Sequence, residues 1–221
     1  MFTYTAVIIE PREHKALGFV LHNFFTNLSE EWGFILFHGN NKEFIDNLFE
    51  NELKPFLYRI TFIKLNTDNL TSIQYNNICK NKNFYKCIPT DILLKFETDS
   101  MILNKDLIND FLEYDYVGAP WLNGMVGNGG LSLRNKNKMI EICEKVQDFT
   151  DHEDNYFSYQ TKVTLNKPSF IKAQTFSVET IFNEKSFGIH APWKYLNKYE
   201  LEFLINKYPD ISTLMHLNKI D

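Results

Sequence analysis

The stretch ILLKFETDS, residues 92–100, decides how the rest of the chain is interpreted. Its first part, 92–96, is short, mostly apolar and typical of a buried β-strand. Directly after it come two carboxylates, Glu97 and Asp99, separated by one residue. An apolar strand that ends in paired acidic residues predicts a sheet with a polar site at its edge.

Three segments upstream of this stretch have the same strand-like character. They are residues 3–9 (TYTAVII), 33–38 (GFILFH) and 58–65 (YRITFIKL). Between these segments, and between the last of them and residue 92, apolar residues recur at helical spacing. This spacing predicts helices over 17–28, 44–49 and 72–79. Strands that alternate with helices predict an α/β fold in which helices cover both faces of a mostly parallel central sheet.

The second half of the chain is less regular. Short strands are expected at 116–118 and 131–133, and helices at 138–149 and 200–207. No internal repeat or linker divides the chain, and 221 residues suit one domain. We therefore expect residues 1–221 to form a single Rossmann-like domain.

Composition excludes several classes of protein. The formal net charge of -5 gives no basic surface for nucleic acid, so no nucleic-acid partner is expected. No apolar run reaches the roughly 18 residues of a membrane span, and the N-terminus lacks the pattern of a signal peptide. The three cysteines, Cys79, Cys87 and Cys143, lack CxxC spacing, which disfavours structural zinc and fits a reducing compartment. We expect a cytoplasmic protein that is not secreted, in the host cytoplasm if the gene is viral.

Polar residues follow three of the predicted strands. In parallel sheets, ligands bind beyond the carboxyl ends of the strands. The predicted ligand-binding residues are therefore those that follow strands one, two and four: Glu10, Pro11, Arg12, Gly39, Asn40 and Thr98.

Glu97 and Asp99 are the strongest local signal for chemistry. Two carboxylates that leave a buried strand can present oxygens to one hard cation, which keeps some waters and bridges phosphates. Such a cation stabilises a diphosphate leaving group as its bond breaks. An ordinary polar strand end gives the same short pattern, because two acidic residues at this spacing occur often by chance.

Three further segments carry weaker signals. VGNGG, residues 126–130, predicts a tight loop that approaches a ligand or simply turns the chain. The pair Glu153 and Asp154 predicts either a base for an acceptor hydroxyl or an acidic helix N-terminus. His190 is either a ligand or a histidine packed beside Trp193.

Taken together, these segments resemble a known family. EPRE, FHGNN, FETDS, YDYVGAPW, VGNGGLSLR, HEDNYF, FSVE and GIHAPW occur in this order over about residues 5–195. This order is similar to that in the small glycosyltransferases of bacteria, fungi and large DNA viruses, which resemble the wider GT-A superfamily. The joint occurrence of YDYVGAPW and GNGGLSLR is specific, whereas each short acidic motif alone is not.

The resemblance implies a role for each matching residue. It implies a GT-A-like domain with a nucleotide-sugar half at about 1–105 and an acceptor half at about 106–221. Pro11 and Arg12 lie where the first loop would meet the nucleotide. Asp99, Glu97 and His190 match residues that bind a metal. Asn128, Gly129 and Gly130 match a loop near the donor sugar and the acceptor. Asp154, with Glu153, matches the base. Because the motif here is Glu-Thr-Asp rather than Asp-x-Asp, Asp99 ranks before Glu97 as a metal ligand.

The implied activity is the transfer of a sugar, with inversion, from a UDP- or GDP-sugar to a glycan or protein acceptor, with Mn²⁺ or Mg²⁺ as cofactor. Two alternatives stay open. A sugar nucleotidyltransferase would also combine an α/β sheet with acidic ligands, although a glycine-rich basic loop is expected after its first strand. The second alternative is a non-catalytic sugar- or nucleotide-binding relative. In either case, the domain can also belong to a larger enzyme.

Overall fold

Four parallel strands form the centre of the molecule. The structure, a computed structural model, describes residues 1–219. β1 (Tyr4–Glu10) pairs in parallel with β2 (Trp32–His38) and with β4 (Ile92–Phe96), and β3 (Ile60–Lys64) pairs with β2. β7 (Leu131–Asn135) and β6 (Tyr116–Gly118) extend this sheet antiparallel to their neighbours, in the order β3-β2-β1-β4-β7-β6. The parallel strands therefore end at one edge, where the acidic segment after β4 begins.

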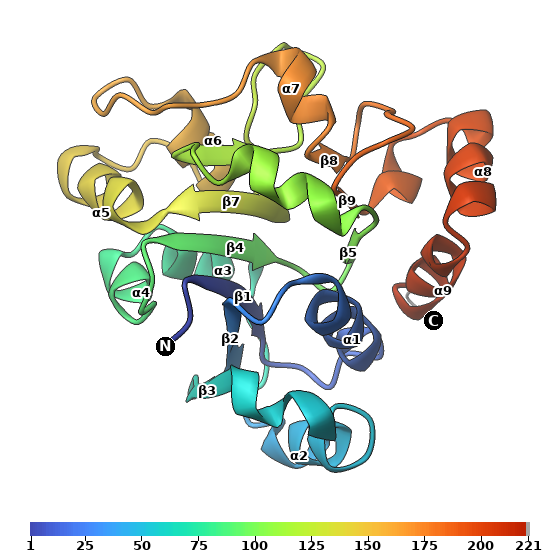
Figure 1. Ribbon diagram of the computed structural model, residues 1–221. Coiled ribbons are helices and arrows are strands. Elements are labelled where there is room, and N and C mark those ends of the chain that lie inside the picture. The colour runs from blue at the N-terminus through green and yellow to red at the C-terminus, as the bar shows by residue number, and fades with distance from the viewer. Residues whose placement is uncertain (220–221) are drawn as a thin grey trace.

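Helices cover both faces of this sheet (Figure 1). Buried residues of one face pack with α1 (Leu17–Asn27), α2 (Lys42–Asn51), α7 (Phe170–Gln174), α8 (Lys198–Lys207) and α9 (Asp210–Leu217). Those of the other face pack with α3 (Ser72–Cys79), α4 (Lys82–Lys86), α5 (Lys136–Lys145) and α6 (Glu153–Tyr159). Three 3₁₀ helices complete the helical elements of the described chain: Lys54–Arg59, Lys105–Phe111 and Pro192–Lys194.

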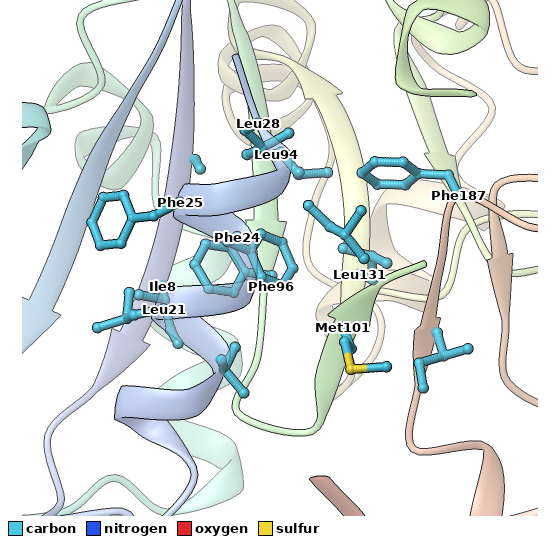
Figure 2. Close-up of a cluster of buried hydrophobic side chains, with 14 of the residues drawn as sticks. Ile8, Leu21, Phe24, Phe25, Leu28, Leu94, Phe96, Met101, Leu131 and Phe187 are labelled. Atoms are coloured by element: carbon cyan, nitrogen blue, oxygen red, sulfur yellow. The ribbon is translucent and has the colours of Figure 1, made fainter. Parts of the chain in front are cut away.

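The two cores follow from the alternation of side chains along each strand. In β4, Leu94 and Phe96 belong to the core on the α1 face, and Leu93 belongs to the core on the α6 face. Phe96 stacks on Phe24 of α1 with ring centroids 3.8 Å apart, at the centre of the cluster in Figure 2. The same alternation turns Lys95 towards the α6 face, where it meets the acidic site rather than solvent.

A second, small sheet brings the end of the chain to the acidic segment. β5 (Ser100–Ile102) pairs antiparallel with β9 (Gly188–His190), which pairs in parallel with β8 (Ser177–Val178). Figure 1 shows β5 and β9 just beyond the end of β4. Because Ser100 lies opposite His190, the histidine is held beside the acidic residues that precede β5.

The predicted fold class is confirmed: this is a single α/β, GT-A-like domain with a mostly parallel central sheet. One predicted strand, 58–65, is shorter than expected. Its first two residues belong to the 3₁₀ helix because buried Arg59 donates hydrogen bonds to the carbonyls of Phe25, Leu28, Ser29 and Trp32. The helix expected at 138–149 spans Lys136–Lys145 instead, because Asn135 caps its start and the backbone becomes extended at Val146. None of the helices in residues 1–219 has the length and apolarity that crossing a bilayer requires.

Candidate active site

Glu97, Asp99 and His190 meet at the carboxyl edge of the parallel strands. One potential ligand atom from each lies within 4.8 Å of the other two. His190 Nε2 is 3.2 Å from Asp99 Oδ1 and 3.7 Å from Glu97 Oε2. The backbone reinforces this arrangement, because Ala191 N donates to Asp99 O at 2.9 Å. The predicted trio is thus brought together from two segments far apart in the sequence.

The trio fits a hard divalent cation. Asp99 Oδ1 is buried and has no hydrogen-bond partner within the described chain, although the imidazole of His190 lies close to it. A buried carboxylate oxygen left without a donor is costly unless a cation satisfies it. Two carboxylates and one imidazole form a ligand set that can hold a divalent cation.

Glu179 fixes the orientation of the His190 ring. His190 Nδ1 lies 3.1 Å from Glu179 Oε1, and Asn128 Nδ2 donates to the same oxygen at 2.8 Å. Glu179 itself is only 4% exposed. Because the carboxylate takes Nδ1, the Nε2 atom is left to face Asp99 and Glu97. A carboxylate behind a histidine in this way is a common support for a metal ligand.

A buried chain of alternating charges runs behind the trio. Lys95 Nζ donates to Glu97 Oε1 at 2.8 Å and lies 3.4 Å from Glu153 Oε1, and Arg134 binds both oxygens of Glu153 at 2.8 and 2.9 Å. Tyr75 Oη also donates to Glu97 Oε1, at 2.7 Å. Glu97 therefore has one oxygen held by Lys95 and Tyr75, while the other faces His190.

This environment lowers the pKa values of the two carboxylates of the trio and raises the pKa of His190. Burial would raise the pKa of Glu97, but Lys95 and then His190 hold it well below its usual range. Burial likewise opposes ionisation of Asp99, but His190 keeps its pKa below the ordinary value. Burial lowers the pKa of His190, yet Asp99, Glu179 and Glu97 together raise it well above the ordinary value. The carboxylates at the trio are thus ionised and attract a positive partner.

The pKa of Asp154 is raised instead. Burial is the larger cause and the negative charge of Glu153 is the next. Asp154 lies at the start of α6, and its Oδ1 accepts from Asn155 N at 2.8 Å. A carboxylate with a raised pKa takes up a proton more readily than an ordinary aspartate.

One hollow is lined by a member of the trio, and a second is lined by a residue that contacts the trio. The first has a volume of about 200 Å³ and is lined by Ile9, Glu10, Pro11, Arg12, Asn69, Leu70, Ser72, Tyr75, Glu97 and Thr98. The second has a volume of about 540 Å³ and is lined by Trp121, Leu122, Asn123, Asn128, His152, Asp154, Asn155, Tyr159, Glu179, Thr180 and Tyr195. Glu97 lines the first hollow, and Glu179, which binds His190, lines the second. The trio is thus connected to both.

Of the ligand-binding residues predicted after strands one, two and four, some line the first hollow and others do not. Glu10, Pro11, Arg12 and Thr98 line the first hollow. Arg12 is paired with Glu10 through Nε and Nη2, at 2.8 and 2.7 Å, so part of its charge is already balanced.

Gly39 and Asn40 do not line this hollow. Gly39 packs against Pro11 and the backbone of Thr67, where a Cβ would not fit. Asn40 is exposed and donates to Asp68 at 2.8 Å. Gly39 therefore packs beside the loop that carries Pro11, and Asn40 binds the segment after β3.

The glycine-rich loop makes room for charged side chains. A Cβ on Gly130 would overlap the imidazole of His190, and one on Gly129 would overlap the carboxylate of Glu153. Gly129 also accepts a hydrogen bond from Lys95 at 2.9 Å through its carbonyl. These glycines are therefore needed for the close packing of the site, whereas the sequence indicated only a tight turn or a ligand contact.

Four residues of the site were not predicted from sequence: Lys95, Arg134, Glu179 and Tyr75. Lys95 and Arg134 are single charged residues within apolar strands, and this pattern is the signal by which the sequence could have indicated them. Both are buried in the structure, at 1% and 0% exposure. Glu179 belongs to the FSVE segment, which the sequence alone gave no role.

Comparison with known protein families identifies the family of this chain. Residues 59–190 match the family described as "Protein of unknown function (DUF5672)", and because this match spans more than half of the chain, the chain belongs to that family. A search of curated proteins gives no match.

Several solved structures share the architecture. The glycosyltransferase GlyE of Streptococcus pneumoniae TIGR4 has a TM-score of 0.59 at 12% identity, over 97% of this chain and 62% of GlyE. An active-site mutant of the galactosyltransferase LgtC has a TM-score of 0.50 at 14% identity, over 69% of this chain and 70% of LgtC. The mannosyltransferase PcManGT of Pyrobaculum calidifontis, in complex with GDP-Man and Mn²⁺, has a TM-score of 0.48 at 11% identity, over 70% of this chain and 50% of PcManGT. The chain thus has a glycosyltransferase-like fold, and it spans less than two thirds of the length of GlyE.

We expect Glu153 to stabilise the fold through Arg134. The substitution Glu153→Gln leaves Arg134 buried without a full counter-charge, so the free energy of unfolding should fall by about 3–5 kcal/mol. Urea denaturation measures this change. The matched variant Glu144→Gln breaks an exposed pair with Lys82 and should cost less than about 1 kcal/mol. Equal effects of the two variants would contradict a structural role for the buried pair.

Proposed function

We propose that this chain is a metal-dependent glycosyltransferase that moves a sugar from a nucleotide diphosphate-sugar donor to an acceptor hydroxyl. The observation that supports it best is the cluster of Glu97, Asp99 and His190, which lines one hollow through Glu97 and is joined to a second through the contact of His190 with Glu179. A transfer reaction needs a donor and an acceptor on either side of one reacting bond, and two hollows that are connected to one cation site are suited to this.

The metal would be held by Asp99 and His190, with Glu97 as a third ligand through the oxygen that Lys95 and Tyr75 leave free. When bound, Mn²⁺ or Mg²⁺ would neutralise charge on the diphosphate leaving group. Lys194 now pairs with Asp99 Oδ2 at 2.9 Å and is half exposed. A metal at Asp99 would compete with this ammonium group, which would then be available for a donor phosphate.

The first hollow is the proposed donor site. Arg12 supplies positive charge, and Tyr75, Asn69 and Ser72 supply hydrogen-bonding groups and a ring. These groups suit a UDP- or GDP-sugar. All residues that line this hollow come before position 105 and all that line the second come after it. This distribution supports a division into a nucleotide-sugar half and an acceptor half.

Asp154 is the proposed base of an inverting displacement. It lines the second hollow, and its raised pKa favours proton uptake. In this reaction a bond forms between the acceptor oxygen and the anomeric carbon, and the bond from that carbon to the phosphate oxygen breaks. The hydroxyl proton passes to Asp154, and the nucleoside diphosphate leaves with the bonding electrons. Glu153 is the weaker candidate because Arg134 holds both of its oxygens.

The proposal is tested by incubating the protein with a panel of nucleotide sugars, with Mn²⁺ or with EDTA. We expect one donor to be hydrolysed slowly to its nucleoside diphosphate, only with metal, as measured by chromatography. Release of pyrophosphate from a nucleoside triphosphate and a sugar phosphate would instead identify a nucleotidyltransferase. Binding without any turnover, including with acceptor panels, would identify a non-catalytic relative.

Asp99→Asn should weaken metal-dependent nucleotide binding by about tenfold or more, because the cation loses a charged ligand. Isothermal titration calorimetry of UDP and GDP, with and without Mn²⁺, measures the affinity. Asp106→Asn removes an exposed carboxylate remote from the trio and serves as the control. An unchanged affinity in Asp99→Asn at full Mn²⁺ would remove Asp99 from the metal site.

Asp154→Asn should retain donor binding but slow transfer by about 10²–10⁴-fold, the usual contribution of a positioned base. Steady-state kinetics with a reactive acceptor measures this, and Asp151→Asn, an exposed aspartate three residues earlier, is the matched control. NMR of the first product gives the stereochemistry. A product that retains the anomeric configuration would rule out the inverting mechanism with Asp154 as its base.

Glu179→Gln should weaken Mn²⁺ binding by about tenfold, because the amide no longer enforces the ring orientation and charge that Glu179 gives to His190. Electron paramagnetic resonance of free Mn²⁺ measures the dissociation constant directly. Glu184→Gln, at an exposed position nearby, is the control. If both variants bind Mn²⁺ as the parent does, the hydrogen bond to His190 has no role in metal binding.

A further inference from the structure

The second hollow has an aromatic wall, here defined as Trp121, Tyr159 and Tyr195. The rings of Trp121 and Tyr159 lie 5.9 Å apart with planes tilted by 58°. Tyr195 is 56% exposed and Tyr159 is 36% exposed, so both present ring surface to solvent. Aromatic rings at the surface beside a reactive carboxylate are unusual unless they contact a ligand.

The wall is held in place by its own local structure. Trp121 lies in a hairpin-like turn in which Trp121 N donates to Met125 O at 2.9 Å and Gly124 N donates to Trp121 O at 3.0 Å. Gly124 has a φ of +85°, a backbone conformation that favours glycine. Asn123 Nδ2 reaches across to Tyr159 Oη at 3.0 Å. These bonds fix Trp121 and Tyr159 relative to each other before any ligand binds.

Apart from Leu122, the remaining lining is polar, and it carries no fixed positive charge. Neither lysine nor arginine occurs among the described residues that line this hollow, whereas Asp154 and Glu179 add two carboxylates. An acceptor with phosphate or carboxylate groups would be repelled. Asn123, Asn128 and Asn155 instead offer the amide donors and acceptors that bind hydroxyl groups.

We propose that the acceptor bound in this hollow is a neutral saccharide, whose terminal ring packs on the aromatic wall. The inference rests on the proposed glycosyltransferase function and names the acceptor class. A pyranose has faces of C–H groups, which bury well against an aromatic ring, and an edge of hydroxyl groups, which suits amides and carboxylates. The volume of about 540 Å³ is in the range of small-ligand sites, at about 300–1,000 Å³, and admits more than one sugar ring. The hydroxyl nearest Asp154 would be the one that accepts the donor sugar.

Saturation-transfer-difference NMR tests this directly. The probes are maltose, cellobiose, lactose, chitobiose and mannobiose, together with short unglycosylated peptides that contain serine, threonine or asparagine. Each is measured with the protein in Mg²⁺, which is diamagnetic, and a nucleoside diphosphate. We expect at least one disaccharide to show saturation of its C–H protons, and Trp121→Ala and Tyr195→Ala to weaken its binding by about tenfold. Trp121→Phe keeps a ring and should bind as the parent does.

Tyr199→Ala is the control, because Tyr199 is an exposed aromatic residue outside the hollow, at 82% exposure. Thermal melting confirms that the variants are folded. Saturation of the peptides alone, of no disaccharide, or of disaccharides equally in the parent and in both alanine variants would overturn the proposal.

Donor hydrolysis in the same preparations separates this inference from the proposed function. Metal-dependent hydrolysis that persists without saccharide binding would reject only the acceptor class. Saccharide binding that depends on the aromatic wall, without hydrolysis of any donor, would reject the transferase function and leave the saccharide site standing.

Discussion

The buried ammonium group of Lys95 is the charge around which the site is built. A lysine at 1% exposure is costly to bury unless its charge is balanced, and the carboxylates of Glu97 and Glu153 balance it at 2.8 and 3.4 Å. Because Lys95 lies on the central strand β4, the sheet fixes its position, and the position of Glu97 follows. The orientation of one metal-ligand candidate is therefore set by the strand pairing of the core rather than by a flexible loop.

The same charge connects the glycine-rich loop to the trio. Gly129 accepts a hydrogen bond from Lys95 and leaves room for Glu153, and the next residue, Gly130, leaves room for His190. A side chain at either glycine would push apart groups that the buried charges hold together. The loop is thus the junction between β4, α6 and β9, and its sequence is constrained by packing within the protein before any ligand is considered.

The sequence was sufficient for the four parallel strands and for α1, α2 and α3, because these strands are mostly apolar and α1 and α2 are amphipathic. It did not predict α4, which has five residues, too few for a periodic pattern. It failed where single residues decide the structure. Arg59 shortens β3 because four carbonyls, in α1, in the turn that follows it and at the first residue of β2, accept hydrogen bonds from its side chain. β5, β8 and β9 have three, two and three residues, too few for any periodicity, so the second sheet could not be foreseen.

The residues of the trio could be named from sequence, but the groups that orient them could not. Asp99 and His190 stand in motifs to which the family resemblance gives a role. Lys95 instead lies within an ordinary strand pattern, and Glu179 lies in the FSVE motif, for which the sequence indicated no role. Their roles depend on which atoms meet across the fold: Glu179 contacts both Asn128 and His190, and so ties the second hollow to the trio. A ligand in that hollow and a cation at the trio would therefore share one hydrogen-bonded carboxylate. Because a bound group that shifts Glu179 also shifts the ring of His190, occupancy of the two places should be coupled, in either order of binding.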